Sequence, residues 1–263
     1  MQNETFLRLG VFLGLFVVLA LAEAMLPRRP STRMGRWPIN WAMIILDSIT
    51  LRIMAIAVPL LAVGAALEAS HRGIGLFNHT TLPSWIEVLL AIIILDFFIW
   101  LQHLITHKVP FLWRFHQVHH ADPEMDVTTA IRFHPVEIAL SAGFKIGLVY
   151  VFGPSAVAVI LFEVLLNGTA MFNHANLRLP IPLDRVVRRV LVTPDMHRVH
   201  HSVYREETDS NYGFSLSLWD RLFGTYIAQP KDGHTGMRIG LLGEYAKPKG
   251  FIHALMMPFR KGR

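Results

Sequence analysis

Long apolar runs constrain this chain more than any other feature of its sequence. Predominantly apolar residues fill 5–25, 40–67 and 84–106, and two shorter runs fill 136–152 and 155–172. About 20 apolar residues in a helix cross the hydrocarbon core of a bilayer, and within lipid only helices and closed barrels satisfy every backbone group. The sequence therefore predicts an all-α fold on a polytopic helical membrane base of about four to five hydrophobic segments.

The composition agrees with a membrane protein. Charged residues make up 17% of the 263 residues and apolar residues 52%, whereas a soluble domain has about 25% charged residues. The net charge is +6, but the basic residues follow no nucleic-acid-binding motif, so we expect no nucleic-acid partner. The chain has no cysteine, which excludes disulfides, cysteine-bound zinc and iron–sulfur clusters.

Loop charges predict the orientation of the segments. The arginines near the first run follow it, whereas a signal peptide carries its basic residues ahead of the apolar stretch, so we expect a retained helix. The 26–39 loop has four arginines and the 68–83 loop has one. Because positive loops stay in the cytoplasm, 26–39, 107–135 and the chain after about residue 173 are predicted to be cytoplasmic. Gly153-Pro154 then turns a tight membrane hairpin on the opposite side.

Histidines gather at the cytoplasmic ends of these runs. They form one pair spaced by four residues and two triplets of the form His-x-x-His-His: His103 and His107; His116, His119 and His120; His197, His200 and His201. Residues three and four apart share a face of a helix, and neutral imidazole is the commonest metal ligand. The adjacent imidazoles of each triplet can divide between two neighbouring metals. The pattern predicts a histidine-rich dimetal site on the cytoplasmic face.

Four further residues are candidates for this site. His174 follows the fifth run, emerges at the same membrane face and is predicted to be a ligand, with a helix-capping role as the alternative. His134 is a candidate for contact with metal or substrate, or for stabilising the turn before the fourth run. Asp96 shares a helical face with the first histidine pair and is predicted to accept a hydrogen bond from an imidazole. Asn176 is a candidate for contact with substrate or with the ligands.

Other metal motifs are missing. The chain has no His-Glu-x-x-His sequence, so the usual helical zinc-protease site is excluded. It also lacks the two Glu-x-x-His motifs of carboxylate-rich di-iron bundles. A shell made of imidazoles alone is neutral, so two metal dications would leave positive charge for bridging oxygen anions to balance. This favours oxygen chemistry.

These segments resemble the fatty acid hydroxylase/sterol desaturase superfamily of integral-membrane non-haem di-iron oxygenases. The resemblance covers roughly 85–227. The matching pieces are Asp96-x-x-x-Trp100-x-x-His103-x-x-x-His107, Trp113-x-x-His116-x-x-His119-His120, Asn173-His174-x-Asn176, Asp195-Met196-His197-x-x-His200-His201, Asn211-Tyr212-Gly213 and the run from Trp219 to Thr225.

The resemblance implies a membrane base with a cytosolic helical cap and two irons between them. By motif, the iron ligands would be His103, His107, His116, His119, His120, His174, His197, His200 and His201, with no catalytic residue beyond them. The irons would activate O₂, the co-substrate, to hydroxylate or desaturate an unactivated C–H bond of a sterol, fatty acyl or other lipid. An external electron donor, a reductase with a ferredoxin or cytochrome, would be required. Asp220 and Arg221 would hold the cap together by an ion pair.

The predicted domains are N-terminal transmembrane helices (1–83), a histidine-box catalytic region (84–227) and a C-terminal tail (228–263). Two other functions stay open: a zinc-dependent membrane enzyme of other chemistry, and a non-enzymatic protein that binds metal or haem. A haem needs only two axial ligands, so it leaves the adjacent histidine pairs unexplained. Residues 183–192 suit either an interfacial helix on anionic headgroups or a packing helix.

Overall fold

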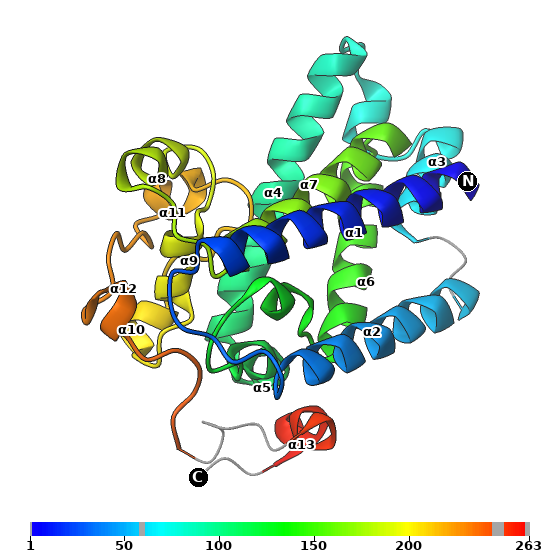
Figure 1. Cartoon of the computed structure of the whole chain (residues 1–263). Coiled ribbons are helices and arrows are strands. Elements are labelled where there is room, and N and C mark those ends of the chain that lie inside the picture. Colours follow the sequence, from blue (N-terminus) through cyan, green and yellow to red (C-terminus); the bar gives the residue numbers. More distant parts are fainter. Residues whose placement is uncertain (1, 58–60, 244–249, 261–263) are drawn as a thin grey trace.

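The computed structural model describes residues 2–57, 61–243 and 250–260. Within these ranges every regular element is a helix, and a few isolated bridges join the loops (Figure 1). The all-α prediction is confirmed. Residues 58–60 of the second predicted run, and 244–249 and 261–263 of the predicted tail, lie outside the described residues.

Five helices are long and apolar enough to cross a membrane. They are α1 (Gln2–Met25), α2 (Trp37–Ala57), α4 (Ser84–Lys108), α6 (Pro135–Phe152) and α7 (Ala156–His174). Their outward faces expose apolar side chains, among them Val18, Ile56 and Val151, as contact with lipid requires. The helices match the five predicted runs, so the chain is a multi-pass membrane protein.

The second predicted run, 40–67, is longer than the membrane helix that it contains. Its residues belong to two helices, α2 and a shorter α3 (Ala62–Arg72). Leu61 has an extended backbone, with φ −63° and ψ 172°, and a new helix begins after it. Hydropathy alone could not find this break, because the apolar composition continues through it.

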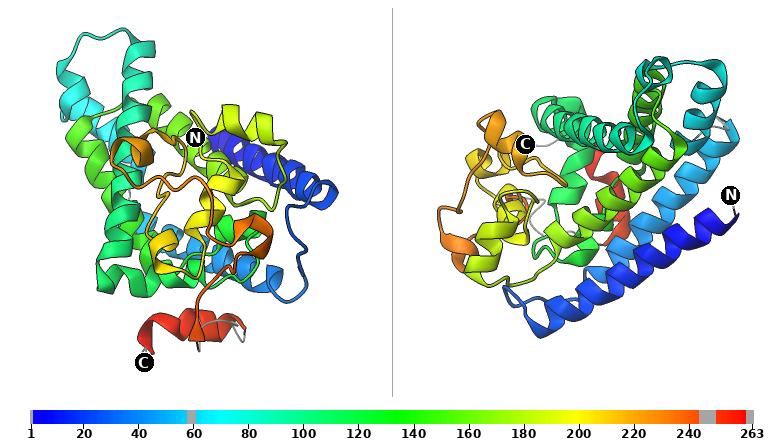
Figure 2. Two further views of the ribbon diagram at one scale, coloured as in Figure 1. Left: turned by 90° about the vertical axis from the view of Figure 1, so that its left-hand side faces the viewer. Right: turned by 90° about the horizontal axis from the view of Figure 1, so that it is seen from above.

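The membrane base is organised around α4, α6 and α7. α7 packs against α4 and α1, and α6 packs against α2 and α3. Leu95 and Ile99 of α4 meet Leu148 of α6 and Phe162 of α7 in one apolar cluster. The helices α6 and α7 follow one another across Gly153-Pro154, but each packs more extensively against other helices, α3 among them, than against the other, so they do not form the predicted tight hairpin. Figure 2 shows the short helices of the later part of the chain gathered at one end of the long helices.

At the end of the base far from the histidines, two glycines allow the end of α6 to contact the segment before η1. Gly153 ends α6 with φ +60°, and Gly75, with φ +96°, precedes the short helix η1 (Leu76–His79). A Cβ added at Gly75 would lie 2.3 Å from the backbone nitrogen of Gly153. Only residues without a side chain allow this approach.

Short helices fill the other end of the bundle. They are α5 (Pro110–His120), η2 (Val127–Ile131), α8 (Ile181–Val187), α9 (Pro194–His200), α10 (Arg205–Thr208), α11 (Leu218–Leu222), α12 (Gly233–Gly236), α13 (Phe251–Met256) and η4 (Met257–Phe259). Figure 1 shows α8 to α12 together beside the ends of α1 and α4. We call these five helices and their loops the cap.

The basic segment 183–192 exposes apolar side chains and buries charged ones. Its helix, α8, ends at Val187, and Leu183, Val186 and Val190 are exposed. The buried face carries an ion pair of 2.5 Å between Asp184 Oδ2 and Arg188 Nε. Arg188 is buried, and Asp184 compensates its charge. The exposed apolar side chains favour the interfacial alternative over the packing helix.

Candidate metal centre

The structure brings all nine predicted ligands together between the base and the cap. His103 and His107 lie in the last two turns of α4, His174 is the last residue of α7, and the two triplets come from α5 and α9. All nine side chains are buried, although neutral histidine is a polar group that needs partners when buried. Segments nearly one hundred residues apart therefore meet at one point.

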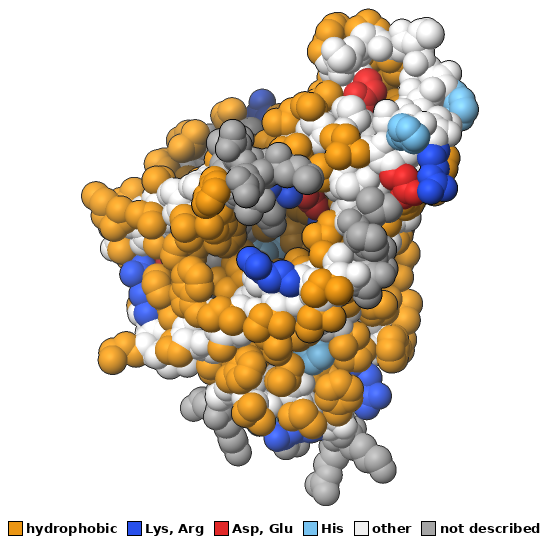
Figure 3. All heavy atoms as spheres, turned by 90° about the vertical axis from the view of Figure 1, so that its right-hand side faces the viewer, with side chains coloured by type: hydrophobic (Ala, Val, Ile, Leu, Met, Phe, Trp, Pro, Cys, Tyr) orange, Lys and Arg blue, Asp and Glu red, His pale blue; other side chains and the backbone are white. Residues whose placement is uncertain are grey.

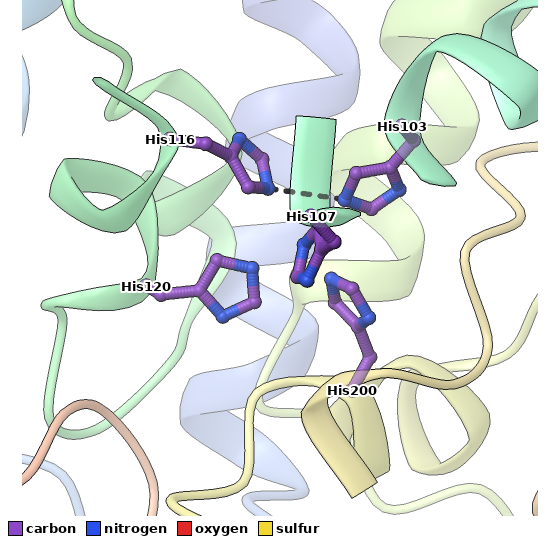
Figure 4. Close-up of side chains that lie close together, drawn as sticks. All are labelled: His103, His107, His116, His120 and His200. Atoms are coloured by element: carbon purple, nitrogen blue, oxygen red, sulfur yellow. Dashed lines mark hydrogen bonds between the residues drawn. The ribbon is translucent and has the colours of Figure 1, made fainter. Parts of the chain in front are cut away.

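The histidines form two groups, each compact enough to hold one metal ion. In each group, one nitrogen from every residue lies within 4.8 Å of the others. The first group is His103, His107, His116, His120 and His200, and the second group is His119, His174, His197 and His201. Figure 4 shows the rings of the first group pointing toward a common centre. Each adjacent pair, such as His119-His120, sends one ring to each group, as the spacing predicted.

The two groups adjoin. The ring centroids of His120 and His201 are 4.5 Å apart, and those of His116 and His119 are 5.3 Å apart. Within the groups the Nε2 atoms are close: 3.1 Å separates those of His103 and His116, and 3.0 Å those of His174 and His119. Two cations held this way would be neighbours.

Buried nitrogen atoms without partners show that the residues fit metal ions. Both ring nitrogens of His107, His120 and His201 are buried and have no hydrogen-bond partner in the described structure. Leaving such a group unsatisfied costs about 1–3 kcal/mol. So many orphaned imidazole nitrogens around one centre are explained if cations occupy the two groups.

Backbone carbonyls orient several of the rings. The Nδ1 atom of His103 lies 2.7 Å from the carbonyl oxygen of Tyr212, and that of His200 lies 2.7 Å from the carbonyl of Ser210. His174 makes the same 2.7 Å contact to Ala170. A carbonyl only accepts, so Nδ1 carries the proton and Nε2 is left as the free electron-pair donor. This is how metal-binding histidines are usually held.

Burial disfavours the charged form of five of the histidines in α5 and at α9. Burial lowers the pKa of His200 to about 3. Burial, and then the neighbouring imidazoles, lower the pKa of His119, His120, His197 and His201 well below its ordinary value. The neutral form is the one that binds a metal ion.

Two carboxylates of the site were not among the sequence candidates. Glu137, in the first turn of α6, accepts a 2.6 Å hydrogen bond from His116 Nδ1. Asp209, in the cap, places an oxygen 3.6 Å from His107 Nδ1. Glu137 carried one signal, an acidic residue at the mouth of an apolar run. Asp209 carried none, because its loop meets α4 only in the folded chain.

Asp96 was expected to fix an imidazole, and the structure corrects this. Its Oδ2 atom accepts a 2.8 Å hydrogen bond from Trp219 Nε1 and a 3.3 Å bond from the backbone N–H of Leu216. Helical periodicity gave the correct face of α4, but the cap covers that face at Asp96. The residue joins the cap to the base.

His134 and Asn176 are also structural. His134 caps α6: its Nδ1 accepts from the backbone N–H of Val136, and its Nε2 lies 3.2 Å from the carbonyl of Leu255. Burial lowers the pKa of His134. The Asn176 side chain bonds to both backbone groups of Arg29, at 3.1 and 2.8 Å. It fastens the α1–α2 loop to the end of α7.

The predicted Asp220–Arg221 ion pair is not formed. Asp220 accepts hydrogen bonds from Trp100 Nε1 at 3.0 Å and from the backbone N–H groups of Tyr212 and Gly213, both at 2.8 Å. Arg221 donates to the carbonyl of Arg188. Asp220 is still structural, because it holds the backbone whose Tyr212 carbonyl orients His103.

A cavity of about 160 Å³ adjoins the first group. His103, His116, Phe133 and Phe214 line its inner end, and residues of α4, α6 and α7 line the rest. Phe133 also stacks flat on His119, with the ring centroids 4.5 Å apart. The cavity therefore reaches from the histidines into the membrane-spanning part of the molecule.

Comparison with known proteins agrees with these features. The model of the fatty acid hydroxylase family matches residues 88–225, which contain all nine histidines. No solved structure matches the chain.

Curated relatives share the same region. The chain is 33% identical to the ornithine lipid hydroxylase OlsE of Rhizobium tropici over 187 residues, which cover 69% of this chain and 53% of that protein. It is 33% identical to an alkylglycerol monooxygenase of Xenopus tropicalis over 138 residues, 51% of this chain and 29% of the relative. A cholesterol 25-hydroxylase-like protein of Danio rerio is 30% identical over 137 residues, with 51% and 53% covered.

The chain spans about half the length of the first relative and under a third of the second. The matched part nevertheless includes every histidine of the two groups and the membrane helices α4, α6 and α7. The chain therefore belongs to the fatty acid hydroxylase family.

Proposed function

We propose that this chain is a membrane-bound, O₂-dependent di-iron oxidoreductase that hydroxylates or desaturates an unactivated C–H bond of a lipid. One observation carries the proposal: two all-histidine groups adjoin, and the first of them ends a cavity that extends among membrane-spanning helices. The names of the relatives, lipid hydroxylases and monooxygenases, support the same reaction class.

The first group would hold one iron and the second group the other. Imidazole ligands suit iron, and an all-nitrogen neutral shell suits a centre that must accept oxygen anions. When bound, the two irons supply the reduction of O₂ and the oxidising power to break a C–H bond. Hydroxylation consumes O₂, two electrons and two protons and gives the alcohol and one water. Desaturation consumes the same O₂, electrons and protons, takes two hydrogens from the lipid and gives the alkene and two waters.

The residues of the chain position the reactants. The Nδ1 partners Tyr212, Ser210 and Glu137 fix the ring planes, so Nε2 stays directed at the centre. Phe133 and Phe214 cover the histidines on the cavity side and keep bulk water from the reacting C–H bond. A lipid reaches this cavity laterally from the bilayer without crossing water.

Electrons come from outside the chain in this proposal. Histidine ligands store none between turnovers, and the chain has no cysteine for an iron–sulfur cluster. A soluble donor, a reductase with a ferredoxin or cytochrome, would reach the centre from the cytoplasm. The arginines of the 26–39 loop support that orientation, because the loop lies at the same end of the bundle as the histidines.

The test is lipid mass spectrometry on cells that express the protein under ordinary or isotopically labelled O₂. We expect a lipid that gains one oxygen atom and carries the label, or a lipid that loses two hydrogens. Neither product should form with His119→Ala. A new oxygen that comes from water, or turnover that persists without O₂ on a zinc-loaded protein, would exclude the proposal.

A further inference from the structure

A charged cluster lies inside the membrane-spanning helices, away from the histidines. Lys145 of α6 donates from Nζ to Glu163 Oε1 of α7 at 2.8 Å, and Arg8 of α1 donates from Nη2 to Glu163 Oε2 at 2.6 Å. Charged side chains in a bilayer are costly and mark functional sites more often than elsewhere. We call these three residues the charged cluster.

Three cavities meet at the charged cluster. The cavity beside the histidines is lined by Lys145 and Asn167 as well as by His103 and His116. A second cavity of about 480 Å³ shares Lys145 and Asn167 with it and also contacts all of the charged cluster. A third, of about 340 Å³, is lined by Arg8, Glu163 and Asn167. Because they share lining residues, the three cavities lie next to one another between the histidines and the charged cluster.

The charged cluster is partly exposed at the surface of the molecule. Figure 3 shows the face with the N-terminal end of α1, where a hollow inside a rim of hydrophobic side chains contains Lys or Arg and Asp or Glu side chains. The side chain of Lys145 is 23% exposed, and that of Arg8 is 30% exposed. Both side chains are therefore partly accessible to a molecule that reaches these cavities.

A purely structural role, in which the ion pairs only hold the helices together, does not account for this arrangement. Ion pairs with that role would be stronger if packed side chains enclosed them, because water and lipid would then not compete for the same groups. The Lys145 ammonium has three N–H donors, and Glu163 is its one acceptor among the described residues. Donors remain that face a cavity, and the polar side chain of Asn167 lines the same space.

We propose that Lys145 binds the anionic group, a carboxylate or a phosphate, of the lipid that is oxidised at the histidines. Glu163 orients the ammonium, and Arg8 adds a second cation at the same point. This inference rests on the proposed function. It adds that neutral sterols and hydrocarbons are poor substrates, because they leave the charged cluster without its ligand.

The position of Lys145 limits where the lipid is oxidised. Lys145 lies eight residues after Glu137, the partner of His116, so about 12 Å separates them along α6. Helical side chains tilt toward the N-terminus, here toward the histidines. This short separation places the reactive carbon in the part of the lipid nearer the anionic group, so the far end of a long acyl chain is not the target.

The direct test is ligand-induced thermal stabilisation of the iron-loaded protein in detergent. The probes are stearate, octadecyl phosphate and octadecanol, which differ only in the polar group. We expect stearate or octadecyl phosphate, whichever matches the natural group, to raise Tm more than octadecanol. Lys145→Met should abolish that difference, Lys145→Arg should restore it, and the exposed-surface control Lys231→Met should behave as wild type. Equal stabilisation by octadecanol, or an unchanged preference in Lys145→Met, overturns the inference.

A second variant covers the case in which Lys145→Met does not fold. Glu163→Gln keeps both cations and removes the carboxylate that competes with the ligand, so the anionic probe should raise its Tm more than it raises that of wild type. An equal or smaller rise overturns the inference. With the substrate in hand, Lys145→Met should raise KM about tenfold or more with little change in kcat, as the loss of a charge-assisted hydrogen bond predicts.

These measurements separate the two proposals. The thermal shift reports binding and needs no turnover. A carboxylate preference that depends on Lys145, without any oxidised lipid, would retain the binding site and exclude the proposed reaction. Oxidised lipid formed by a protein that prefers octadecanol would retain the proposed reaction and exclude the anion-binding role of Lys145.

Discussion

Three imidazoles of the candidate centre are positioned by residues from other segments. Tyr212 and Ser210 of the cap orient His103 and His200, and Glu137 of α6 orients His116. These partners hold the tautomer in which Nε2 is free for metal. The ligands were predictable because their spacing is local. Their partners were not, because they come from chain segments that meet only on folding.

The first prediction concerns Glu137. Glu137→Ala removes the acceptor of His116 Nδ1, and loss of such a partner typically lowers metal affinity or activity about 10–100-fold. Glu137→Gln keeps an acceptor oxygen and should retain more of both. Iron per chain and kcat measure the effect, and Glu206→Ala, at an exposed position, is the control. Full iron content and wild-type kcat in Glu137→Ala would show that the contact is incidental.

The second prediction concerns His119, one of four nitrogens in the second group. His119→Ala should abolish turnover and lower the iron content, while the protein still inserts in the membrane, because α5 is outside the spanning helices. His79→Ala, an exposed histidine at the opposite end, should have neither effect. Retained activity in His119→Ala would remove it from the ligand set.

At the scale of elements, hydropathy located the membrane helices because burial in lipid is a local requirement on composition. Hydropathy did not separate α2 from α3, because the apolar composition continues between the two helices. The prediction for Asp96 was wrong for a related reason. Periodicity predicts the face of a helix, but Trp219 of the cap, and not a histidine, covers that face. Contacts between elements depend on the whole fold.

The third prediction tests the glycine contact between α6 and the segment before η1. Gly75→Ala should lower Tm, because its Cβ would lie 2.3 Å from Gly153 N and the residue has φ +96°. Gly147→Ala, inside α6 with nothing within 4 Å of an added Cβ, should be neutral or stabilising by about 1 kcal/mol. Iron content should change in neither. Equal Tm values for the two variants would contradict the close approach.

At the scale of the molecule, a buried ionic network joins the base to the segment after α5. Arg36 lies beside the start of α2. Its guanidinium donates a 2.7 Å hydrogen bond to Asp122 Oδ1 and a second hydrogen bond to Asp126. Asn40 donates to Asp122 and to Thr128 Oγ1. This network fixes the end of α5, where His119 and His120 lie. No sequence motif predicted it, because its members are separated by more than eighty residues.

The fourth prediction follows from this network. Arg36→Met removes the cation that bonds to the buried carboxylates of Asp122 and Asp126, and breaking a buried pair typically costs about 3–5 kcal/mol. We expect a lower Tm together with a loss of iron, since the end of α5 carries ligands of both groups. Arg114→Met, at an exposed position, is the control. An unchanged Tm in Arg36→Met would show that the network contributes little to stability.

The measurement that tests the central claim most directly is elemental analysis of the protein purified without air after expression with ample iron. Two histidine groups predict about two irons per chain. Single substitutions in either group, His120→Ala or His174→Ala, should each lower that number, whereas His79→Ala should leave it unchanged. One metal per chain, or zinc alone, would contradict a di-iron centre.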